Sequence, residues 1–249
     1  MAIERNLKIL LISTKNEKGS MERCFFEPSK KQNLSFLGIA RNTLEEESGI
    51  AGVIKLLRSN KLQANLITNY TQVIFKDRLE VLYGSPEDEN KDVYPDIIGH
   101  ASEGYDMVFV DLDNNVPDKC RRKILEASDI VVMNLSQRLS SIEDYLAVKE
   151  DEPIYKSPKT LILIGRYDKF SKYNSKNITR HLKEKNQVLT IPYNTLFFEA
   201  AEEGGVAEIF LRFRKKLSSE DRNAFFIEEV KRASESIVYR QQLLKNKRL

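Results

Sequence analysis

Four short apolar runs constrain the fold of this 249-residue chain more than any other feature of its sequence. They cover residues 9–12, 107–110, 130–133 and 160–164. Each run is rich in β-branched residues and apolar on consecutive positions, which is typical of parallel strands that helices cover on both faces. We therefore expect these four runs to form buried parallel strands.

Helical patterns lie between the apolar runs, at residues 49–58, 119–127, 142–149 and 178–185. Weaker strand patterns occur at residues 35–40 and 79–82, and residues 188–191 resemble a last strand. Because strand and helix patterns alternate along the chain, the sequence predicts an α/β fold: a doubly wound, predominantly parallel sheet with helices on both faces. Residues 86–95 are acidic and contain two prolines, so we expect a surface loop there.

The composition excludes several classes of protein. With 41% hydrophobic residues the chain can build a core, and a formal net charge of +3 is not the footprint of a dedicated nucleic-acid binder. The two cysteines, Cys24 and Cys120, follow no metal-ligand spacing and suit a reducing compartment. No stretch approaches the roughly 20 apolar residues that cross a bilayer. We therefore predict a cytoplasmic protein whose membrane contact, if any, is peripheral at the inner face.

The pattern changes after Gly204 and Gly205, where apolar residues recur at helical spacing with charges between them. We divide the chain into an α/β domain, residues 1–217, and a C-terminal amphipathic helix, residues 218–249. The main apolar residues of that helix are Phe225, Phe226, Val230, Ile237, Leu243 and Leu244. Such a stripe usually packs on the rest of the fold, while the basic end "LLKNKRL" also fits a helix that binds a partner or a membrane surface.

The pair Tyr105-Asp106 leads into an apolar strand that ends at Asp111, and Ser128-Asp129 precedes a further apolar strand. This order of motifs resembles the ParA/MinD family of deviant-Walker P-loop ATPases. The likeness continues through "TLILIGRYDKFSK" and "VLTIPYNTLFFEAAEEGG" and covers most of residues 7–213. It implies a P-loop NTPase fold in which Asp111 corresponds to the Walker B aspartate.

The loop after the first strand departs from the family pattern K-G-G-x-G-K-[TS]. Lys15 and Gly19 match, but Glu17 replaces a glycine, Ser20 replaces the phosphate-binding lysine and Met21 replaces the magnesium-binding hydroxyl. Such a loop binds phosphate through converging backbone N–H groups, a lysine and a hydroxyl on Mg²⁺. A methionine cannot hold a hard cation, and a glutamate repels phosphate. The resemblance therefore implies a degraded nucleotide site.

Lys18 partly replaces the missing charge, so weak binding of ATP and Mg²⁺ remains an alternative. The residues that the resemblance assigns to the relic nucleotide site are Lys15, Lys18, Gly19, Ser20, Asp111, Arg166, Asp168 and Pro192. We expect no catalytic residue, no cofactor and no metal, with Asp111 as the ligand if Mg²⁺ binds. At residues 35–40 the family's switch aspartate is also replaced, which further disfavours phosphoryl transfer.

Family members position cargo such as plasmids, division machinery, pili or secretion systems, and the TadZ/CpaE-like members have atypical P-loops. The resemblance therefore implies a pseudo-ATPase with a positioning, scaffolding or regulatory role in an envelope-associated machine. It also implies protein partners, a homodimer and peripheral membrane contact through the C-terminal helix, and no nucleic-acid partner. The alternative is a genuine ATPase of this type that binds ATP weakly through an atypical P-loop.

Overall fold

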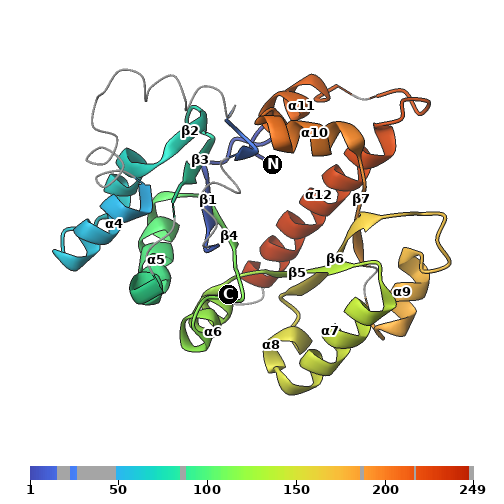
Figure 1. Ribbon diagram of the computed structural model, residues 1–249, viewed down its shortest axis with the longest axis horizontal. Helices are drawn as coiled ribbons and strands as arrows, with labels where there is room; N and C mark the ends of the chain where they lie inside the picture. The colour runs from blue at the N-terminus through green and yellow to red at the C-terminus, as the bar shows by residue number, and fades with distance from the viewer. Residues whose placement is uncertain (16–22, 27–48, 85–87, 186–187, 216, 247–249) are drawn as a thin grey trace. The chain divides into compact units, whose positions relative to one another are not determined.

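The computed structural model describes residues 1–15, 23–26, 49–84, 88–185, 188–215 and 217–246 (Figure 1). The chain forms two compact units. Unit 1 consists of Met1–Ile124 and Leu196–Arg214, and unit 2 of Leu125–Thr195 and Lys215–Leu249. Each unit has its own sheet and its own core. The predicted strand at residues 35–40 lies outside the described residues.

Among the described residues, the sheet of unit 1 has four strands in the order β2-β3-β1-β4. Strand β1 (Ile9–Ser13) lies between β3 (Leu79–Leu82) and β4 (Met107–Asp111) and is parallel to both. These three strands confirm the sequence prediction. Strand β2 (Gln72–Phe75) was not predicted, and it pairs antiparallel with β3 at the edge of the sheet. A hairpin turn with Asp77 in the left-handed region (φ 58°) joins the two strands.

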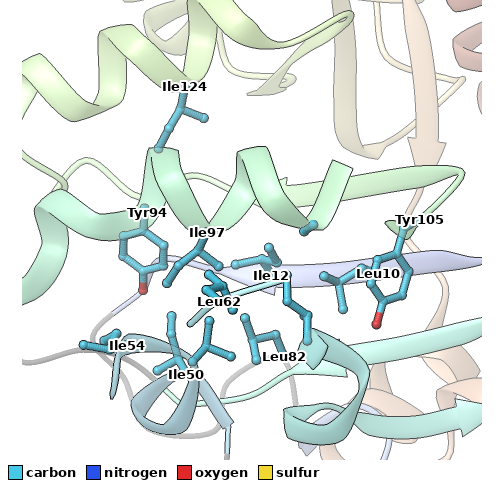
Figure 2. Packing of buried hydrophobic residues seen from close by; sticks show 13 residues of the cluster. Leu10, Ile12, Ile50, Ile54, Leu62, Leu82, Tyr94, Ile97, Tyr105 and Ile124 are labelled. Atoms are coloured by element: carbon cyan, nitrogen blue, oxygen red, sulfur yellow. The ribbon is translucent and has the colours of Figure 1, made fainter. Parts of the chain in front are cut away.

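The core of unit 1 forms where β1 and β3 meet the helices α4 (Gly49–Arg58) and α5 (Tyr94–Gly104). Figure 2 shows its side chains gathered beside β1. The largest of its fully buried side chains are Leu10, Ile12, Ile50, Val53, Ile67, Leu82, Tyr94 and Ile97. Leu10 and Ile12 are two residues apart, so they point to the same face of β1. That face is therefore the one that packs on the helices.

Residues 88–95 are not the surface loop that the sequence predicts. Asp88–Val93 form the 3-10 helix η3, and Tyr94 begins α5 with a fully buried side chain. Pro95 lies in the first turn of α5, where a helix does not need its missing N–H group. Pro95 therefore starts a helix instead of preventing one.

The sheet of unit 2 has three parallel strands in the order β5-β6-β7. They are β5 (Val131–Ser136), β6 (Thr160–Tyr167) and β7 (Leu189–Pro192), which confirms the three strands predicted there. The connecting helices are α7 (Leu139–Asp151), α8 (Pro153–Lys156) and α9 (Ser175–His181). Ile142, Tyr145, Ile164, Ile178 and Leu182 fill the core of this unit.

The remaining helices are short, apart from the last. They are η2 (Ala64–Tyr70), α6 (Asp118–Ala127), α10 (Thr195–Glu203) and α11 (Val206–Arg212). Helix α6 confirms the helix predicted at residues 119–127. In the described part of the chain, no helix is long and apolar enough to cross a bilayer.

The C-terminal helix α12 (Ala224–Asn246) packs on β7 within unit 2. Phe226, one of the six apolar residues singled out in the sequence, is buried, and the other five are partly buried. Packing, the more common role of such a stripe, is therefore what the structure shows for this helix. Contact with a partner or a membrane through the same helix stays a prediction, as does the domain boundary after residue 217.

Candidate functional site

The candidate site lies in unit 1, where β1 and β4 end side by side. Ser13 is paired with Asp111 in the parallel ladder, so the two residues after Ser13 continue beside the loop that follows Asp111. The carboxyl ends of parallel strands are the usual place for ligands in α/β sheets. Lys15 and Asp111, both predicted site residues, are brought together here.

Lys15 and Asp111 form an ion pair, with 3.2 Å between Lys15 Nζ and Asp111 Oδ2. Each side chain is 42% exposed, so water screens the attraction and the pair adds at most about 1 kcal/mol to stability. The ion pair matters for the chemistry of the site, because the positive charge of Lys15 neutralises Asp111, the one carboxylate that the resemblance assigns to Mg²⁺.

Thr14 is a buried residue of this site that the sequence analysis missed. Its N–H donates to the carbonyl oxygen of Asp111 (3.0 Å), and its hydroxyl donates to the same oxygen (3.1 Å). The hydroxyl also accepts the N–H of Asp113 at 2.8 Å. Thr14 therefore fastens the loop after β1 to the loop after β4. A single polar residue at the end of an apolar run gives no signal that would have identified this role.

Two side chains from η3 and α5 contact the same pair of loops. The Tyr94 hydroxyl donates to the carbonyl oxygen of Ser13 (3.3 Å), and burial raises the pKa of Tyr94 above its ordinary range. The ammonium of Lys91, a buried residue, donates to the carbonyl oxygen of Asn115 (3.5 Å). Asn115 N–H in turn donates to Asp113 Oδ1 at 2.8 Å. The carboxylate of Asp113 thus stabilises a turn in the loop.

The other predicted site residues fall into two groups. Lys18, Gly19 and Ser20, together with Met21, lie outside the described residues. Arg166, Asp168 and Pro192 belong to unit 2, at the carboxyl ends of β6 and β7.

In unit 2, Arg166 is exposed and has a left-handed backbone (φ 51°), where the register of β6 shifts against β7. Asp168 is exposed, and its Oδ1 accepts the N–H of Phe170 at 2.9 Å. Pro192 is buried and is paired with Tyr167 in the ladder. Asp168 and Pro192 therefore have structural roles of their own in this unit.

The described residues fit Mg²⁺ poorly. Mg²⁺ prefers carboxylate, hydroxyl and water oxygens in an octahedron. Here Asp111 is paired with Lys15, and the hydroxyl of Thr14 is engaged by backbone groups. Within the described ranges there is no group of three or more histidine, cysteine or acidic residues that could hold a metal ion.

No protein-family model matches the sequence. No curated protein matches it at a significant level either. Solved structures do match. A ParA family ATPase from Chlorobium tepidum TLS has 15% identity and a TM-score of 0.62, and the match covers 91% of this chain and 85% of that one.

Two further solved structures show the same likeness. A putative plasmid partition protein from Borrelia burgdorferi B31, bound to AMPPNP, has 16% identity and a TM-score of 0.55, over 98% of this chain and 88% of that one. MinD from Aquifex aeolicus, in a complex with MinC, has 13% identity and a TM-score of 0.55, over 92% and 84%. At this level of identity the matches establish architecture. The chain has the α/β fold of the ParA/MinD ATPases.

Proposed function

We propose that the protein is a ParA/MinD-like pseudo-ATPase that works by binding other proteins. Its role is to position, scaffold or regulate an envelope-associated machine, such as a pilus, secretion, division or partition apparatus. The single observation that carries the proposal is the Lys15–Asp111 ion pair at the end of β1 and β4.

The ion pair supports loss of nucleotide chemistry for an electrostatic reason. Asp111 is the carboxylate available to position a cation, and a neighbouring ammonium 3.2 Å away opposes binding of a second positive charge. The sequence of the preceding loop supports the same conclusion, because Ser20 and Met21 stand where a lysine and a hydroxyl bind phosphate and Mg²⁺ in the family. Phosphoryl transfer consists mostly of positioning and charge stabilisation, so losing both removes the activity.

Calorimetric titration of the full chain with ATP and Mg²⁺ tests this proposal. We expect no binding below about 1 mM, and no change for Lys15→Ala or Asp111→Ala. Lys61→Ala, at an exposed lysine after α4, is the matched control. Micromolar binding that Lys15→Ala and Asp111→Ala abolish, and that Lys61→Ala retains, would contradict the loss of the nucleotide site and favour the alternative, a genuine ATPase with an atypical P-loop.

The protein-binding part of the proposal rests on the fold. MinD from Aquifex aeolicus was solved in a complex with MinC, and that protein shares this architecture. We propose a homodimer that forms through the face where the relatives hold nucleotide, with partners at the C-terminal helix. Light scattering after size-exclusion chromatography checks the dimer. The expected mass is the same with and without ATP, and a dimer that appears only with ATP contradicts a nucleotide-independent scaffold.

A further inference from the structure

The loop between β6 and α9 in unit 2, residues 168–174, exposes an aromatic side chain to solvent. Phe170 is 87% exposed, more than any other large hydrophobic side chain in the described ranges. The loop contains two lysines, Lys169 and Lys172, and both are exposed. Lys169 Nζ lies 5.2 Å from the centroid of the Phe170 ring and 4.7 Å from that of Phe225.

Gln137, at the end of β5, fixes the conformation of this loop. Its side-chain amide group donates to the carbonyl oxygens of Asp168 and Tyr173, each at 2.9 Å. Its side-chain oxygen accepts the N–H of Asp168 at 2.8 Å. One side chain therefore holds both ends of the segment that carries Phe170.

Further hydrogen bonds within the loop and to α9 stabilise the conformation of the loop. Asp168 accepts the N–H of Phe170 (2.9 Å), and the Tyr167 hydroxyl accepts the N–H of Ser175 (3.1 Å). Asn174 caps α9, and Asn177 Nδ2 donates to the carbonyl oxygen of Lys172 at 2.8 Å. The exposure of Phe170 is thus imposed by an ordered turn. A single exposed apolar side chain is ordinary on a protein surface, so the significance of Phe170 depends on the charges that accompany it.

The same segment concentrates positive charge. Residues 166–185 contain seven lysines and arginines and two acidic residues, Asp168 and Glu184, whereas the whole chain has a net charge of +3. Glu184 forms an ion pair with Lys149, and Asp168 is occupied in the turn. The exposed cations that remain are Arg166, Lys169, Lys172, Lys176, Arg180, Lys183 and Lys185. A ligand for this surface must therefore be anionic and must accept an apolar ring.

We propose that this surface docks on a membrane of anionic phospholipid, with the Phe170 ring in the boundary between headgroups and acyl chains. The exposed lysines and arginines of the same segment bind lipid phosphates. A single exposed ring in a lysine-rich loop suits a lipid interface better than single-stranded nucleic acid, whose bases stack on several aromatic side chains. The other aromatic residue of the loop, Tyr173, packs against the core of unit 2. This docking is separate from the C-terminal helix and does not depend on the loss of nucleotide binding.

Co-sedimentation of the full chain with vesicles tests the proposal. We expect binding to vesicles of phosphatidylcholine with about one third phosphatidylglycerol, little binding to pure phosphatidylcholine, and weakening as salt rises. Phe170→Ala lowers the partition coefficient about tenfold, because an inserted ring loses its apolar contact. Lys172→Glu lowers it by about 25-fold, since each unit of charge near such a surface contributes roughly fivefold.

Matched controls separate the loop from the rest of the chain. Tyr239→Ala removes an exposed aromatic side chain of α12, and Lys61→Glu makes the same change in net charge within unit 1. Both are expected to bind like the unmodified chain, apart from a small and general effect of charge. Leu243→Glu/Leu244→Glu, at the end of α12, is expected to retain binding through the loop.

Three results would overturn this assignment. One is equal binding by the unmodified chain, Phe170→Ala and Lys172→Glu. Another is loss of binding in Leu243→Glu/Leu244→Glu while the loop variants bind normally, which would transfer the contact to the C-terminal helix. The third is absence of binding to the phosphatidylglycerol vesicles, and tight binding of a fluorescent single-stranded oligonucleotide that Phe170→Ala abolishes would then assign the surface to nucleic acid. Calorimetry with ATP is unaffected by each of these results, so the two proposals fail independently.

Discussion

Gly49 begins α4 in the left-handed region, with a backbone φ of +63°. A Cβ atom at this position would lie 2.6 Å from the carbonyl oxygen of Tyr83 and 2.9 Å from the Tyr83 ring. The close approach has a structural use, because the N–H of Ile50 donates to the same carbonyl oxygen at 2.9 Å. Glycine is therefore required where α4 meets the end of β3.

We predict that Gly49→Ala lowers the free energy of unfolding by about 2 kcal/mol or more, from left-handed strain plus the clash with Tyr83. Gly99→Ala is the matched control. Gly99 lies inside α5, and an added Cβ meets no atom within 4 Å, so alanine stabilises the helix by about 0.5 to 1 kcal/mol. Urea denaturation measures both changes. Equal effects of the two substitutions would show that the Gly49 geometry is wrong.

Tyr145 in α7 is predicted to make stability depend on pH in the alkaline range. Its hydroxyl is buried and has no hydrogen-bond partner among the described residues. Burial, reinforced by the charge of Glu184, raises the pKa of Tyr145 to about 12, against about 10 in an unfolded chain. Between pH 10 and 12 the unfolded state therefore binds fewer protons than the folded state. Stability falls there by up to about 1.4 kcal/mol per pH unit from this group.

Tyr145→Phe should reduce that alkaline loss and leave stability at pH 7 unchanged or higher, because it removes an unsatisfied buried hydroxyl. Denaturation curves from pH 7 to 11.5 give the comparison. Tyr239→Phe, at an exposed tyrosine, is the control and is expected to leave the profile unchanged. A marked loss of stability at pH 7 in Tyr145→Phe would indicate that the hydroxyl has a partner after all.

At the scale of elements, a buried carboxylate attaches α12 to β7. Glu229 accepts hydrogen bonds from the Thr190 hydroxyl and, at 2.5 Å, from the Arg232 guanidinium. The Glu229 side chain is buried, so its charge depends on these partners. Helix α12 is thus positioned by a specific polar contact as well as by its apolar stripe.

We predict that Glu229→Ala lowers the free energy of unfolding by about 2 to 3 kcal/mol, since the Thr190 hydroxyl and the Arg232 guanidinium both lose the carboxylate that accepts their hydrogen bonds. Glu235→Ala, an exposed glutamate of the same helix, should change it by no more than about 0.5 kcal/mol. Thermal and urea denaturation are suitable measurements. If both variants behave alike, the Glu229 contact contributes nothing to the attachment of α12.

At the scale of the whole molecule, each unit draws on segments that are distant in sequence. Unit 2 includes the C-terminal Lys215–Leu249, and Phe225 of α12 packs on its core. The core cluster of unit 1 contains no residue from α12. Deleting the C-terminal helix therefore removes part of unit 2 and leaves the core of unit 1 complete.

Hydrogen exchange measured by mass spectrometry on a chain that ends at residue 220 checks this division. We predict loss of protection in β6 and β7, because their cover is gone, and retained protection in β1, β3 and β4. The Leu243→Glu/Leu244→Glu variant, with an intact α12 backbone, should keep protection throughout. Exposure of β1 in the shortened chain would refute the independence of the first core.

The sequence by itself determined most of the described strands and helices, because buried parallel strands are continuous apolar runs and amphipathic helices have a strong period. Ile9 to Ile12 and Thr160 to Ile164 are two such runs. It did not predict α5, since Pro95 breaks a helix in the interior but starts one in the first turn, and only packing around Tyr94 selects between these outcomes.

The site depended still more on tertiary structure. The sequence identified Lys15 and Asp111 separately, but a sequence pattern carries no information on whether two side chains 96 positions apart meet. The parallel register of β1 and β4 brings them to 3.2 Å, and the same register lets the hydroxyl of Thr14 join the two loops. Local sequence patterns thus determined the strands and helices, while the pairing of β1 with β4 decided which charged side chains neutralise each other.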